Sequence, residues 1–212
     1  MFRIVTIIGF VITIAGIVCH YIALSVGKGR RWRPIDILRK LVFLLTLLFL
    51  EQKLSAIGIF RKLVYLLALL CFVVLAVTGF FPTLILGEHL SGYLLMVHAT
   101  FAPVFAGCVA VLSVMWAHNC RFTKNNLQQE ALTKTTDSAT GSEKCKIGQK
   151  ISFWLIVSLT VPLILSIVAS MFPLFGTDIQ KLLLNLHRYS ALLLAIAAIV
   201  HTYLIILTQT RK

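Results

Sequence analysis

The chain has 212 residues, of which 59% are hydrophobic and 13% are charged, and its mean hydropathy is +0.95. Soluble domains are roughly 45–50% apolar and about 25% charged, so this composition excludes a soluble globular domain, a disordered chain and a disulfide-rich secreted scaffold. The formal net charge is +13, from 20 Lys and Arg against 7 Asp and Glu. In a membrane protein such an excess usually records basic residues kept on the cytoplasmic side rather than a nucleic-acid partner. The sequence therefore indicates an all-α integral membrane helical bundle, embedded in the lipid bilayer, with no nucleic-acid partner.

Five apolar segments are long enough to cross a bilayer, which takes about 20 residues. They are predicted at residues 4–26, 63–84, 90–117, 151–172 and 182–208. The first lacks a small-x-small cleavage site and is followed by a basic cluster, so it is predicted to be a retained helix and not a signal peptide. A sixth apolar stretch, residues 41–50, is too short to cross and is expected to lie on the membrane surface or to be re-entrant. The polar segment 120–150 is expected to be a flexible connection.

The distribution of basic residues predicts the orientation. If five helices cross with the N-terminus outside and the C-terminus inside, only Arg3, Lys181 and Arg188 fall in outer segments. The other 17 of the 20 basic residues then lie inside, as the positive-inside rule requires. The chain is predicted to comprise two parts. Residues 1–60 form the first helix and a basic, amphipathic cytoplasmic segment, and residues 61–212 form a four-helix domain.

Two histidines on the last segment, His187 and His201, carry the clearest chemical signal. They are 14 residues apart, so on a helix they point within about 40° of each other and stand about 21 Å apart along the axis. A histidine inside a bilayer is costly unless it is paired or functional. Two haems stacked across a membrane need this arrangement on one helix, with partner histidines on neighbouring helices. The alternative is that both histidines make structural hydrogen bonds within the bundle.

Depth in the membrane selects the partner histidines. His98 lies about eight residues into its span and His187 about five, both counted from outside, so the two are candidate ligands of an outer haem b iron. His20 matches His201 in depth from the inner side and is the preferred inner partner. His118 stands about 30 Å from His98, roughly 9 Å too far for the spacing set by the last helix. The alternatives are that His118 serves nevertheless or that the inner haem is absent.

Several short elements occur in an order that resembles the cytochrome b subunits of formate dehydrogenase and thiosulfate reductase type enzymes. They are VTGFF at 77–81, His98, GQK at 148–150, and the H-x13-H pair His187 and His201, which together cover about 150 residues. The resemblance implies a four-helix cytochrome b domain with two haems b. His98 and His187 would hold the periplasmic-side haem and His201 the cytoplasmic-side haem. The family takes its fourth ligand from the start of the block's first helix, which reads FRKLVYLL here and has no histidine. His20 on the additional N-terminal helix would replace that ligand.

The resemblance also implies a quinone site near the inner haem, beside an N-x-G-Q-K element. Gly148 and Gln149 match that element and are candidate quinone-binding residues, whereas Lys146 replaces the asparagine. The alternative is that GQK simply begins a helix on the cytoplasmic side. Arg188 is a candidate to pair with a haem propionate, or else an interfacial anchor.

Together these features predict a dihaem b-type cytochrome of the bacterial inner membrane that passes electrons between the quinone pool and a periplasmic partner. The external loops are short and no soluble catalytic domain is present, so the partner is expected to be an iron–sulfur or multihaem cytochrome c subunit. No catalytic residue is predicted on this chain. One rival interpretation is a haem-free transporter or assembly subunit with structural or proton-relay histidines. Another is a basic scaffold that binds anionic lipid.

Overall fold

A computed structural model describes residues 1–26, 56–118, 120, 147–172 and 176–209, and every regular element in them is helical. The elements are α1 (Phe2–Val26), α3 (Ala56–Phe81), the short π-helix η1 (Pro82–Leu86), α4 (Gly92–Ala117), α6 (Ile147–Met171) and α7 (Thr177–Gln209). Five helices in the described part of the chain are long and apolar enough to cross a membrane. The predicted all-α, five-span membrane bundle is therefore confirmed. The surface segment predicted at 41–50 and residues 121–146 of the predicted loop lie outside the described residues.

The helices extend beyond several of the predicted spans. α3 begins at Ala56, seven residues before the predicted span, so the proposed division at residue 60 falls inside a helix. α6 begins at Ile147 and includes the GQK sequence in its first turn, so residues 148–150 of the predicted loop belong to a helix, as in the alternative that GQK begins one. The physical reason is that hydropathy marks the hydrocarbon core of the bilayer. A helix can continue beyond that core through the polar interface, because its backbone hydrogen bonds are made within the helix.

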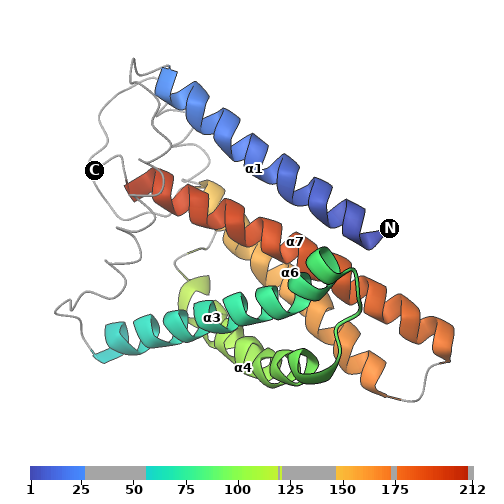
Figure 1. Cartoon of the computed structure of the whole chain (residues 1–212). Coiled ribbons are helices and arrows are strands. Elements are labelled where there is room, and N and C mark those ends of the chain that lie inside the picture. The colour runs from blue at the N-terminus through green and yellow to red at the C-terminus, as the bar shows by residue number, and fades with distance from the viewer. Residues whose placement is uncertain (27–55, 119, 121–146, 173–175, 210–212) are drawn as a thin grey trace.

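The four C-terminal helices pack as two hairpins, α3 with α4 and α6 with α7 (Figure 1). α1 lies along α7 and runs parallel to it. The ring centroids of Phe2, at the start of α1, and Tyr189 are 5.4 Å apart, and those of His20 and Tyr203, further along both helices, are 5.7 Å apart. A first and a fifth span must run in the same direction, so this parallel packing agrees with an odd number of crossings.

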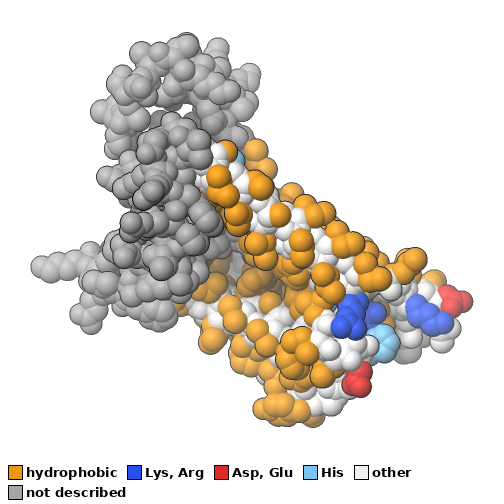
Figure 2. Space-filling view, turned by 45° about the horizontal axis from the view of Figure 1, so that its top comes forward, with side chains coloured by type: hydrophobic (Ala, Val, Ile, Leu, Met, Phe, Trp, Pro, Cys, Tyr) orange, Lys and Arg blue, Asp and Glu red, His pale blue; other side chains and the backbone are white. Residues whose placement is uncertain are grey.

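One end of the bundle carries the start of α1 and the turn between η1 and α4. The predicted orientation puts this end outside, and it is here called the outer end. The turn needs glycine, because Gly87 and Gly92 have φ angles of 73° and 59°, which L side chains rarely adopt. On the face in Figure 2, charged side chains gather at this end, and apolar side chains cover most of the remaining described surface.

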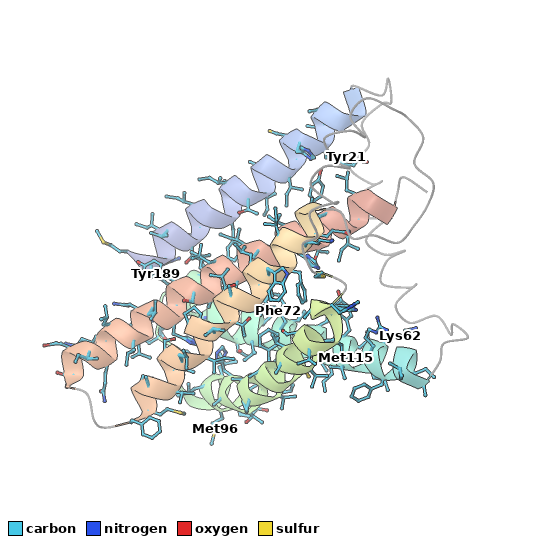
Figure 3. The ribbon with its side chains drawn as sticks, turned by 180° about the vertical axis from the view of Figure 1, so that it is seen from behind. Tyr21, Lys62, Phe72, Met96, Met115 and Tyr189 are labelled. Atoms are coloured by element: carbon cyan, nitrogen blue, oxygen red, sulfur yellow. The ribbon has the colours of Figure 1, made fainter. Side chains whose placement is uncertain are left out.

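The centre of the bundle is an apolar core that joins the two hairpins. Cys71 of α3, Phe105 of α4 and Leu194 of α7 are buried there, and Phe72 packs against them. Figure 3 shows Phe72 between the hairpins and Tyr189 where α1 meets α7. This core separates the outer half of the bundle from the half that contains His201.

Candidate functional site

A cavity lies between the two hairpins on the outer side of the core. It contains about 600 Å³ of empty space, a figure that includes the part open to the surroundings. All four helices of the hairpins line it, and among the residues that the structure describes, His98 and His187 are the only polar ones in the lining. The remaining lining residues are Phe72, Leu75, Ala76, Phe80, Ala102, Phe105, Leu163, Ile164, Ile167, Ala191, Leu194 and Ala195.

The two imidazoles face each other across this cavity. Their ring centroids are 6.4 Å apart and the ring planes are inclined by 77°. With a metal–nitrogen bond of about 2.0 Å, two imidazoles on opposite sides of one iron have their centres about 6.3 Å apart. The separation of His98 and His187 therefore fits an iron atom between them. The apolar lining fits the macrocycle of a haem.

A threonine hydroxyl orients the His98 imidazole. Thr78 Oγ1 lies 2.8 Å from the Val74 carbonyl oxygen and 2.9 Å from His98 Nδ1. The carbonyl can only accept, so the hydroxyl proton goes to Val74, and Thr78 accepts a hydrogen bond from His98 Nδ1–H. The lone pair of this neutral imidazole is then on Nε2, the nitrogen available to a metal.

A main-chain carbonyl oxygen orients the His187 imidazole. His187 Nδ1 lies 3.0 Å from the Leu163 carbonyl oxygen, which also accepts a hydrogen bond of 2.9 Å from Ser166 Oγ. Because that oxygen can only accept, His187 Nδ1 carries the proton and Nε2 carries the lone pair. With Nδ1–H donating, each cavity histidine in its neutral form has its lone pair on Nε2. This is the protonation state that metal ligation requires.

The predicted inner residues lie together at the other end of the bundle. Ser152 Oγ is 2.7 Å from His201 Nδ1 and 3.1 Å from the Gln149 carbonyl oxygen, so His201 Nδ1–H donates to the hydroxyl, as at His98. Gly148 packs closely on α7, because a Cβ atom there would be 3.5 Å from a methyl group of Leu204. The structure thus brings both candidate quinone-binding residues to the end of α7 that carries His201.

His20 lies elsewhere. Its Nδ1 is 2.6 Å from the Tyr203 hydroxyl. α1 contacts α7 at Tyr189 and Tyr203, and Gly9 of α1 faces Leu192 and Ile196 of α7. At about 100° per residue, these four positions on α7 point about 140–200° away from His187. His201 points within about 40° of His187, so His20 and His201 do not face each other in this structure. The assignment of His20 as an iron ligand stays a prediction.

This packing leads to a test of His20. We expect His20→Phe to leave the haem content of the purified protein unchanged, because the residue contacts the face of α7 opposite to His201. Phenylalanine preserves a ring against Tyr203. A pyridine haemochrome assay against protein concentration measures the ratio. Loss of one haem would instead show that α1 supplies an axial ligand, as the sequence predicts.

His118 lies on the surface, and Arg188 is half-buried. Arg188 Nη2 donates a hydrogen bond of 3.1 Å to His89 Nδ1, which ties the η1–α4 turn to α7. The proposed contact of Arg188 with a propionate stays a prediction. His118 caps the C-terminal end of α4 and is exposed.

The sequence interpretation missed Thr78, Ser152 and the Leu163 carbonyl, which are the hydrogen-bond acceptors of the three histidines. Two of them carried a signal, since a hydroxyl residue within an apolar span often has a specific polar partner. A main-chain carbonyl carries no such signal in the sequence.

A multi-span helical bundle with two facing imidazoles in an apolar cavity is the architecture of a membrane cytochrome b. Residues 56–212 match the prokaryotic cytochrome b561 family, about three quarters of the chain. The chain belongs to the prokaryotic cytochrome b561 family, a family of haem-b-binding electron-transfer proteins of the membrane. The match does not distinguish the formate dehydrogenase or thiosulfate reductase type, and α1 lies outside it. A search of curated proteins found no significant match.

Proposed function

We propose that the protein carries electrons between the quinone pool and a partner protein on the outer face of the bacterial inner membrane. The observation that carries this proposal is the pair His98 and His187, whose rings are 6.4 Å apart in an apolar cavity with both Nδ1 groups already hydrogen-bonded. Haem b supplies a one-electron carrier when it is bound there. His98 and His187 would hold the iron, and the apolar side chains around them would exclude water.

The proposed quinone site is at the inner end, near the first turn of α6. Gly148 and Gln149 precede Ser152 by about one turn, and Ser152 accepts the hydrogen bond of His201. A quinone needs an apolar surface for its ring and tail and hydrogen bonds for its oxygens. The half-buried Gln149 would supply hydrogen bonds, and the apolar end of α7 would supply the surface for the ring and tail.

We further propose a second, inner haem on His201, as the formate dehydrogenase and thiosulfate reductase type implies. The support is that the Ser152 hydroxyl accepts a hydrogen bond from His201 Nδ1, as the Thr78 hydroxyl does from His98 Nδ1. The electron partner would be a periplasmic iron–sulfur or multihaem cytochrome c subunit. The η1–α4 connection supports the need for such a subunit, because it spans only residues 87–91 and offers little surface for a hydrophilic substrate.

The function is tested with the purified protein in liposomes. The reduced-minus-oxidised spectrum is expected to show a b-type α-band near 560 nm, roughly where bis-histidine haem absorbs. Adding a reduced quinone should produce the same band without a chemical reductant. A protein without this band would contradict haem binding. A band that appears with dithionite and never with a quinol would contradict the quinone assignment alone.

A further inference from the structure

We propose that Thr78 is the positioning residue of His98 and that its hydroxyl sets the reduction potential of the haem in the outer cavity. The inference rests on the proposed function only in requiring that a haem binds between His98 and His187. It assigns a role to a residue of α3 that does not itself line the cavity.

The contacts of Thr78 allow its hydroxyl only one hydrogen-bond arrangement. The side chain is only 6% exposed, so water does not compete for it. Its proton goes to the main-chain carbonyls one turn earlier, at 2.8 Å from Val74 O and 3.3 Å from Leu75 O. The oxygen is therefore left as an acceptor, 2.9 Å from His98 Nδ1.

The next residue, Gly79, limits the position of the same ring. A Cβ atom at Gly79 would lie 3.3 Å from His98 Cε1 and 3.8 Å from Nδ1. The imidazole thus rests against the backbone of α3 where a side chain would crowd it. One helix supplies both the hydrogen bond that orients the ring and the surface that limits its movement.

The two cavity histidines differ in what a substitution can change. His187 donates to a main-chain carbonyl, which no side-chain replacement removes. His98 donates to a side chain, so its acceptor can be deleted. A hydrogen bond from the distal ring nitrogen makes an imidazole a stronger donor to its metal, and such donation stabilises the oxidised iron. Without the acceptor, we expect the reduction potential to rise.

The test compares Thr78→Val with a matched variant, Thr160→Val. Thr160 is 3% exposed and donates to the Ile156 carbonyl at 2.8 Å, as Thr78 does to Val74. Both variants lose the same kind of back-bond, whereas only Thr78→Val removes a histidine partner. We expect Thr78→Val to raise the midpoint potential of one haem, to alter the low-spin EPR signal of its ferric form, and to weaken haem retention roughly 10–100-fold. Thr160→Val should behave as wild type.

Two further variants keep the outcome decisive if Thr78→Val does not accumulate. Thr78→Ser restores the hydroxyl and should restore the wild-type potential. Thr78→Cys offers a thiol, which accepts hydrogen bonds weakly, and should shift the potential in the same direction as valine. Unchanged potential and EPR signal in the Cys variant, or in the Val variant where it accumulates, would overturn the inference while leaving haem binding intact. A wild-type protein without haem would instead overturn the proposed function.

Discussion

Replacing His187 with alanine is expected to abolish haem binding in the cavity between the hairpins. The imidazole is one of two polar side chains that the described part of the chain contributes to the lining, and the other lining side chains are apolar and cannot take its place on the iron. The Leu163 carbonyl keeps its hydrogen bond from Ser166, so the helix itself should tolerate the change. The measurement is the reduced-minus-oxidised spectrum of the purified variant, in which the contribution of this haem should be lost.

A matched control for this experiment is His118→Ala. His118 is exposed at the end of α4, away from the cavity lining, and its loss should leave the spectrum unchanged. His98→Ala should reproduce the result of His187→Ala, since the two imidazoles hold one site from opposite sides. Full haem content in either cavity variant would contradict the assignment of this pair.

The second large effect is expected from His201→Ala, which should lower the ratio of haem to protein from about two to about one if an inner haem is bound as proposed. Ser152 holds the His201 ring with Nε2 free, as in the outer cavity. Pyridine haemochrome analysis measures the ratio, and the remaining haem should keep its wild-type spectrum.

Thr202→Val is the control for His201→Ala. Thr202 is adjacent in sequence, and its hydroxyl donates to the Ala198 carbonyl of its own helix at 2.8 Å. A ratio near one in wild type that His201→Ala leaves unchanged would show that the chain holds the outer haem alone.

Much of the fold is accessible from the sequence because bilayer thickness imposes a length on each apolar segment. The predicted segments 4–26 and 90–117 agree with α1 and α4 to within two residues at each end. The early start of α3 could not be predicted by hydropathy, since Arg61 and Lys62 are polar. Long basic side chains reach the interface from a continuous helix, so they do not end it.

The candidate site was predictable to the extent that it depends on depth. The rise per residue is fixed, so counting residues correctly brought His98 and His187 to one level. The direction in which a helix faces its neighbours depends on packing. α1 presents Phe2 and His20 to the tyrosine face of α7, which no count of residues reveals. Depth alone therefore suggested a partner for His201 that the packing places on the other side of the helix.

The paired hairpins also bear on how the protein is assembled in the cell. Each hairpin satisfies its backbone hydrogen bonds internally, so it can insert into the bilayer as a unit. The two hairpins contact each other far less extensively than the helices within each hairpin do, and their shared interior includes the cavity. A cofactor in that cavity would touch both hairpins and complete their association. The yield of mature protein during biogenesis should consequently follow the supply of haem, with the chain more exposed to membrane proteases when haem is scarce.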